Sequence, residues 1–183
     1  MQKIIVLCLI IVPLLWAQEP VTNTVSVPGA NIAVASVKPS AAIEEDAPEL
    51  DIEMFLRNRI AVLAQKYLGV PYKSAGAGPE GFDCSGFVYF VYREAAGMNV
   101  SRSTAGIWNS GKKIALNQVY PGDVLVFTTV RAGASHAGIV LENGSKGIIF
   151  IHAASQGSKT GIIISNMNES YYKTRFMGAR NYF

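Results

Sequence analysis

The feature that most constrains the fold of this chain is a change in the spacing of its apolar residues near residues 121–123. Before this point, apolar residues recur every three or four positions, over residues 51–68 and again over 85–97. Beyond it they fall in short β-branched runs separated by turns, at residues 124–129, 136–142, 147–153, 161–167 and 175–182. The first spacing predicts helices and the second predicts strands. Helices followed by a meandering antiparallel sheet predict an α+β fold, with the helices packed on one face of the sheet.

Local signals mark the ends of the two expected helices. Asp51 can cap the first helix, and Gly69 can end it. A stretch rich in glycine and proline, residues 71–81, then predicts a surface loop. Cys84 stands between this loop and the second helix, which ends at Gly97. We therefore expect Cys84 at the N-terminus of the second helix.

The first 49 residues differ from the rest of the chain. Residues 1–17 begin with a positive charge, continue in an apolar run over 4–16 and end at Ala17. The run is shorter than the roughly 20 residues that span a bilayer, so it predicts a secretory signal peptide cleaved after Ala17, and no stable membrane span. Residues 18–49 are rich in Pro and Ala, which predicts a linker. The folded domain is expected at residues 50–183, and the protein is expected in the periplasm, in the cell envelope or secreted.

Cleavage of the signal peptide would leave one cysteine, Cys84, because Cys8 lies in the apolar run. A lone thiol in an exported protein has no partner for an internal disulfide, so it is either a buried small hydrophobe or a nucleophile. Its expected place at a helix N-terminus favours the nucleophile. Free N–H groups there lower the pKa of a thiol and can donate to an oxyanion.

A thiol nucleophile needs a base that also protonates the leaving group, and imidazole suits both tasks. The chain has two histidines, His136 and His152, on either side of the turn sequence at residues 142–146. This arrangement predicts a β-hairpin. With Gly144 at its centre, the two histidines lie equally far from the turn and face each other on one side of the ladder. A two-residue turn at residues 143–144 would instead put His152 on the other face.

The sequence offers weaker support for two other classes of protein than for a thiol enzyme. Zinc could use Cys84, Asp83 and the two histidines as ligands, but their spacing forms no compact ligand motif, so no metal is predicted. The formal charge of +3, from 16 Lys and Arg against 13 Asp and Glu, is too mild and too scattered to predict a nucleic-acid partner.

Several motifs resemble a known family. They are the run GVPYKSAGAGPEGFDCSGFVYFVYREAAGMNVSRST, followed by YPGDVLVF, SHAGIVLENG, FIHAAS and RFMGAR. Together, in this order, they resemble the NlpC-type family of bacterial cell-wall cysteine peptidases, which are papain-like in architecture. The resemblance covers residues 52–183. The family uses Cys, His and a third polar residue, often His, and the resemblance assigns these roles to Cys84, His136 and His152.

The resemblance also implies further site residues and a substrate. Tyr72 would assist the oxyanion site, and Asp83 and Ser85 would line the substrate pocket. The implied function is that of an exported peptidoglycan hydrolase that cleaves stem peptides between D-glutamate, through its γ-carboxyl, and a diamino acid. We expect a monomer that needs no cofactor. An amidase or acyltransferase using the same three residues, and a non-catalytic cell-wall-binding module, are the alternatives.

Overall fold

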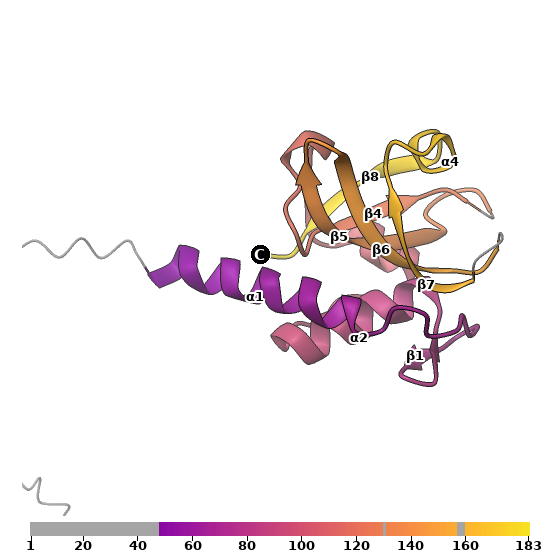
Figure 1. The fold of residues 1–183 in the computed structure, drawn as a ribbon, viewed down its shortest axis with the longest axis horizontal. Helices are drawn as coiled ribbons and strands as arrows, with labels where there is room; N and C mark the ends of the chain where they lie inside the picture. Colours follow the sequence, from indigo (N-terminus) through magenta and orange to yellow (C-terminus); the bar gives the residue numbers. More distant parts are fainter. Residues whose placement is uncertain (1–47, 130, 157–159) are drawn as a thin grey trace, which may run out of the picture. The chain divides into compact units, whose positions relative to one another are not determined.

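The structure is a computed structural model that describes residues 48–129, 131–156 and 160–183. The expected signal peptide at 1–17, and most of the expected linker at 18–49, lie outside the described residues. The described part combines helices with an antiparallel sheet, so the predicted α+β class is confirmed (Figure 1). Within it, no helix has the length and apolar character needed to cross a membrane.

A six-stranded antiparallel sheet forms the centre of the fold, in the order β3-β8-β4-β5-β6-β7. Its strands are β3 (Lys112–Ile114), β4 (Val124–Phe127), β5 (His136–Gly144), β6 (Gly147–Ala154), β7 (Gly161–Asn166) and β8 (Phe176–Asn181). The strands β4 to β7 follow one another as the expected meander, and β8 returns to pair with β4. The sequence did not predict β3, because this short edge strand begins with two exposed lysines instead of an apolar run.

The helices are α1 (Pro48–Gln65), α2 (Cys84–Ala96), α3 (Thr104–Asn109) and α4 (Ser170–Lys173), with a 3₁₀ turn, η1 (Leu116–Gln118). Between α1 and α2, the expected surface loop contains a two-stranded ribbon of β1 (Ala77–Gly78) and β2 (Gly81–Phe82). The prediction that Asp51 caps the first helix is wrong. The helix begins at Pro48, a residue type that the first turn of a helix tolerates. Gly97 ends α2 as expected, in a left-handed conformation with φ of 65°.

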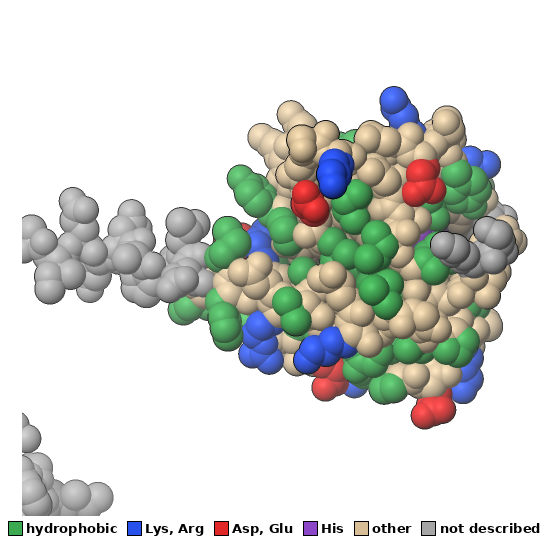
Figure 2. Space-filling view, viewed as in Figure 1, with side chains coloured by type: hydrophobic (Ala, Val, Ile, Leu, Met, Phe, Trp, Pro, Cys, Tyr) green, Lys and Arg blue, Asp and Glu red, His purple; other side chains and the backbone are tan. Residues whose placement is uncertain are grey.

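The first helix is buried over only part of its expected apolar face. Ile60 and Ala64 are fully buried in the core between α1, α2 and one face of the sheet. Ile52 and Phe55, which share the same helical spacing, are 59% and 58% exposed. The first turns of α1 project beyond α2 and the sheet (Figure 1). Figure 2 shows apolar side chains gathered at that end, with basic and acidic side chains interspersed over the face in view.

A buried ion pair fixes α1 to the turn before β4. Arg57 on α1 donates to Asp123 Oδ1 at 2.9 Å and to the carbonyl oxygen of Pro121 at 3.1 Å. Asp123 is fully buried and Arg57 is nearly so. Removal of one partner would leave a buried charge unpaired, which costs about 3–5 kcal/mol. This pair therefore sets how the helical layer sits against the sheet.

Candidate active site

The start of α2 is built by its capping residue. The Asp83 carboxylate accepts a hydrogen bond from the Gly86 backbone N–H at 2.7 Å, which satisfies one of the free donors of the first turn. Gly86 is required here, because an added Cβ would lie 2.0 Å from the Gly76 carbonyl oxygen. The cap makes Cys84 the first residue of α2, and the expected place of this thiol at a helix N-terminus is confirmed.

The thiol of Cys84 is buried against the beginning of β5. Its Sγ lies 3.8 Å from the Ser135 carbonyl oxygen and 3.8 Å from Thr104 Oγ1. Ser135 comes directly before His136 in the chain, and the backbone of Ala137, directly after it, lowers the pKa of the thiol. The sulfur therefore contacts the residue that directly precedes His136.

Burial raises the pKa of the Cys84 thiol above its ordinary value. The Thr104 hydroxyl and the backbone of Ser85 and Ala137 oppose this shift, whereas the Asp83 charge adds to it. The backbone at the helix N-terminus lowers the pKa of the thiol, as expected, but burial outweighs it, so the net shift is upward. At rest, Cys84 is a neutral thiol.

The two histidines form a hydrogen-bonded pair. Nε2 of His136 lies 2.9 Å from Nδ1 of His152. The pair packs among aromatic rings: Phe150 stacks on His152 with ring centroids 5.1 Å apart, and Phe127 lies 6.0 Å from His136. Burial lowers the pKa of His136 to about 4 and that of His152 well below its ordinary value. Both imidazoles are therefore neutral near pH 7.

The hairpin turn between the histidines differs from both predicted turns. It is a two-residue turn at residues 145–146, since Gly144 pairs with Gly147. Gly147 has φ of 97°, a conformation that favours glycine next to such a turn. With this turn alone, His136 and His152 would lie on opposite faces of the sheet.

A β-bulge returns the two histidines to the same face of the sheet, as expected. The register of β5 and β6 shifts by one residue between Val140 and Glu142. His136 and His152 therefore share a face, as diagonal neighbours and not as a directly opposed pair. Gly138 leaves room between them, because an added Cβ there would lie 3.1 Å from the His152 Cβ.

A cluster of hydrogen-bonded polar side chains lies around the start of α2. Arg102 holds Asp83 with two hydrogen bonds of 2.8 Å, one to each carboxylate oxygen. The Arg102 guanidinium also donates to Ser85 Oγ at 3.1 Å and to the Gly76 carbonyl oxygen at 3.0 Å. The Ser85 hydroxyl donates to Asp83 Oδ1 at 3.2 Å. The structure thus brings the predicted residues Asp83 and Ser85 together beside Cys84.

Two residues of this region, Arg102 and Thr104, are not among the site residues predicted from the sequence. Both belong to the segment SRST, which lies inside the run that carries the family resemblance. That segment was the available signal, but the spacing of its residues does not reveal which side chains turn toward the thiol.

Tyr72 lies in the same region. It forms a bridge with Phe82, two residues before Cys84. Burial raises the pKa of the Tyr72 hydroxyl, the Cys84 side chain in its thiolate form and the Asp83 carboxylate raise it further, and the Arg102 charge lowers it. The Tyr72 backbone is thus fixed beside the strand that leads to Asp83 and Cys84.

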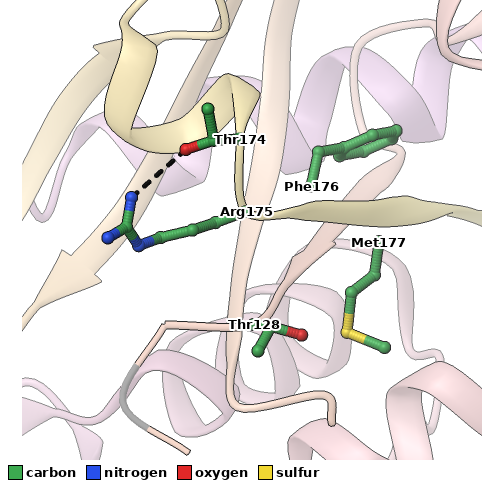
Figure 3. A pocket seen from close by; sticks show the side chains of 5 residues that line it. All are labelled: Thr128, Thr174, Arg175, Phe176 and Met177. Atoms are coloured by element: carbon green, nitrogen blue, oxygen red, sulfur yellow. Dashed lines mark hydrogen bonds between the residues drawn. The ribbon is translucent and has the colours of Figure 1, made fainter. Parts of the chain in front are cut away.

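A separate hollow of about 420 Å³ contains none of the predicted site residues (Figure 3). It is lined by Thr128, Thr174, Arg175, Phe176 and Met177. The intervening strand β4 separates it from His136, since Phe127 pairs with Phe176 on one side and with His136 on the other. Over the described ranges, no group of three or more His, Cys, Asp or Glu side chains is arranged to hold a metal ion.

The sequence matches known proteins over this same region. Residues 69–181 match the NlpC/P60 family. The chain is 43% identical over 119 residues to the probable peptidoglycan endopeptidase LytE of Bacillus subtilis, covering 65% of this chain and 32% of LytE. It is 41% identical over 121 residues to the γ-DL-glutamyl hydrolase of the same organism, covering 65% of this chain and 28% of that protein. It thus spans about a third of the length of these two relatives.

A third relative is matched over most of its length. The chain is 35% identical over 141 residues to the murein DD-endopeptidase MepS/murein LD-carboxypeptidase of Escherichia coli, covering 76% of this chain and 70% of MepS. Among solved structures, the NlpC/P60 domain of the peptidoglycan hydrolase SagA superposes with a TM-score of 0.57 at 28% identity, covering 69% of this chain and 98% of that domain. The chain belongs to the NlpC/P60 family, and its fold is papain-like, as expected.

Proposed function

We propose that this protein is an exported cysteine peptidase that hydrolyses peptide bonds in the stem peptides of peptidoglycan. The contact of the Cys84 sulfur with Ser135, directly before His136, together with the His136–His152 hydrogen bond, carries this proposal. The relatives named as peptidoglycan endopeptidases support it. We further propose that residues 1–17 are the signal peptide, and that the enzyme acts as a monomer.

In the proposed reaction, His136 accepts the thiol proton as the Cys84 sulfur attacks the carbonyl carbon of the scissile bond. The oxyanion that forms is held by the Cys84 backbone N–H, with Tyr72 as a second donor. Collapse of the tetrahedral intermediate breaks the C–N bond, and His136 gives its proton to the leaving amine. Water, deprotonated by His136, then hydrolyses the thioester and restores the thiol.

His152 would orient His136 throughout this cycle. Its hydrogen bond to Nε2 of His136 leaves Nδ1 as the ring nitrogen free to serve the thiol. Because His152 is neutral, it stabilises the His136 imidazolium less than a carboxylate would. The low polarity of the surrounding aromatic rings strengthens the hydrogen bond between His136 and His152.

We propose the bond from the γ-carboxyl of D-glutamate to a diamino acid as the one cleaved. The relative named a γ-DL-glutamyl hydrolase supports this choice. The Asp83 carboxylate and Ser85, next to Cys84, would bind the ammonium group of a shortened stem peptide. Arg102 already occupies both Asp83 oxygens, so the ammonium group would share this carboxylate with the guanidinium.

Mass analysis of products from purified sacculi and from defined stem peptides tests the proposal. We expect soluble muropeptides ending in D-glutamate with a free γ-carboxyl, and none from a Cys84→Ser variant. Release of intact stem peptides from the glycan would instead identify an amidase, and a joined product would identify an acyltransferase. Persistent binding to sacculi without any released product would identify a wall-binding module.

A further inference from the structure

The residues behind His152 form a feature that the proposed reaction does not yet use. Nε2 of His152 lies 3.0 Å from the Tyr172 hydroxyl and 3.2 Å from Ser165 Oγ. Ser165 Oγ in turn donates to the Tyr172 hydroxyl at 3.3 Å. The exposed fractions are 1% for His152, 8% for Tyr172 and 7% for Ser165. A closed triangle of buried hydrogen bonds thus lies on the side of His152 away from His136.

Three separate elements supply this triangle. His152 is on β6, Ser165 is on the neighbouring strand β7, and Tyr172 is on the short helix α4. The Tyr172 ring packs edge-on against Phe150 and His152, with centroids 4.9 Å and 5.3 Å away. In the part of the chain that the structure describes, the titratable groups in contact with His152 are His136 and Tyr172, and no charged side chain hydrogen-bonds to it.

The protonation state of His136 decides which hydrogen-bond partner Nε2 of His152 requires. When His136 holds the thiol proton, both of its ring nitrogens carry hydrogen, so its Nε2–H must donate to Nδ1 of His152. His152 is neutral, and its single hydrogen must then sit on Nε2. A buried N–H without an acceptor is costly, and the oxygens of Tyr172 and Ser165 are the acceptors in reach among the described residues.

We propose that Tyr172 and Ser165 are positioning residues that hold His152 in its Nε2–H tautomer while His136 is protonated. They act through His152 and do not touch the substrate, and the inference rests on the proposed function of the Cys84–His136 pair. Hydroxyls suit this place because each can donate or accept. To accept the thiol proton at Nδ1, His136 already carries its hydrogen on Nε2, so His152 keeps the Nε2–H tautomer before and after the transfer, and the two hydroxyls can accept its hydrogen bond throughout.

The test uses Tyr172→Phe, Ser165→Ala and the double variant. Tyr172→Phe keeps the ring packing and removes only the hydroxyl. Tyr171→Phe is the matched control, because Tyr171 is on the same helix, is 44% exposed, and its hydroxyl hydrogen-bonds nothing among the described residues. Ser165→Thr is the conservative variant that keeps a hydroxyl on β7.

Two measurements separate positioning from a loss of structure. The rate of Cys84 alkylation by iodoacetamide, followed against pH, reports the thiolate–imidazolium pair without any substrate. Steady-state kinetics on a defined stem peptide separate kcat from KM. We expect the double variant to lose about 10- to 100-fold in kcat and in alkylation rate near neutral pH, by analogy with the loss of partners that orient histidines at metal sites. KM should change little, and each single variant should lose less.

The controls and a melting curve make each outcome decisive. Tyr171→Phe and Ser165→Thr should stay within about twofold of wild type, since neither removes a needed acceptor. A folded double variant with unchanged alkylation and kcat overturns the inference; if the double variant does not fold, Tyr172→Phe alone decides in the same way. If the wild type hydrolyses no stem peptide but the double variant is still alkylated more slowly than the wild type, the positioning role is supported and the proposed function is rejected.

Discussion

The thiol and the histidine pair, the two halves of the site, have contrasting surroundings. Cys84 lies at a helix terminus beside polar groups, including the Asp83–Arg102 ion pair. His136 and His152 lie among aromatic rings and are hydrogen-bonded to each other. Burial raises the pKa of the thiol and lowers the pKa of both imidazoles, so each half is neutral at rest.

This difference shows why the two halves depend on each other. A thiolate alone or an imidazolium alone would be an unpaired charge in a buried place. Transfer of one proton from Cys84 to His136 creates both charges together, and each then stabilises the other at low local polarity. The site is therefore expected to react as a unit, and the following changes test that dependence from its strongest consequence to its weakest.

Loss of either member of the reacting pair should be almost equally severe. We expect Cys84→Ser and His136→Ala each to lower kcat/KM by about 10³-fold or more, because groups that act together in catalysis are not additive. Steady-state hydrolysis of a defined stem peptide measures this, with melting curves as the check on folding. Activity of His136→Ala within tenfold of wild type would show that the thiol does not depend on this imidazole.

Loss of the second histidine should be milder. His152→Ala removes the group that orients His136 but leaves the proton carrier, so we expect a loss of about 10- to 100-fold in kcat, by analogy with partners that orient histidines at metal sites. The same assay applies, with His136→Ala as the reference. Equal losses in the two variants would mean that His152 does more than orient its neighbour.

The buried histidines should make the protein less stable in acid. His136 binds a proton in the unfolded chain below its ordinary pKa of 6.5, but in the folded protein only near its pKa of about 4. Stability is therefore lost as the pH falls from about 6.5 to about 4, by ~2 kcal/mol at pH 5 for His136 alone. Urea unfolding at pH 7.5 and pH 5 measures the difference. His136→Gln should reduce it, and an unchanged difference in that variant would contradict the assignment.

The polar half should respond more weakly to loss of its own charge partner. Arg102→Gln leaves the Asp83 carboxylate uncompensated beside Cys84, and this charge raises the pKa of the thiol further. We expect alkylation of Cys84 near neutral pH to slow by about 3- to 10-fold, since the pair is partly exposed and screened. The control is Arg93→Gln, which breaks an exposed ion pair with Glu94 on α2, the helix that begins at Cys84. Equal rates in both variants would rule out a role for Arg102 at the thiol.

The contrast between the two halves also explains how far the sequence could predict them. The thiol's position depends on neighbours in the chain: Asp83 caps the helix, Gly86 permits close packing, and Gly97 ends it. The pairing of His136 with His152 was predicted on the correct face but in the wrong register. The turn at residues 145–146 shifted the register by three residues from the predicted one, and the β-bulge shifted it back by one. Neither shift could be read from a distinctive residue pattern.

The sequence by itself determined the α+β order of elements, the place of Cys84 at a helix N-terminus and the family to which the chain belongs. These depend on local spacing, capping and ordered motifs, which act over a few residues. Tertiary structure alone decided that Arg102 would hold Asp83, and that Ser165 and Tyr172 would meet behind His152. It also decided the charge state of the site. Burial of Cys84 and His136 arises only when distant segments pack together and exclude water, and that exclusion shifts both pKa values.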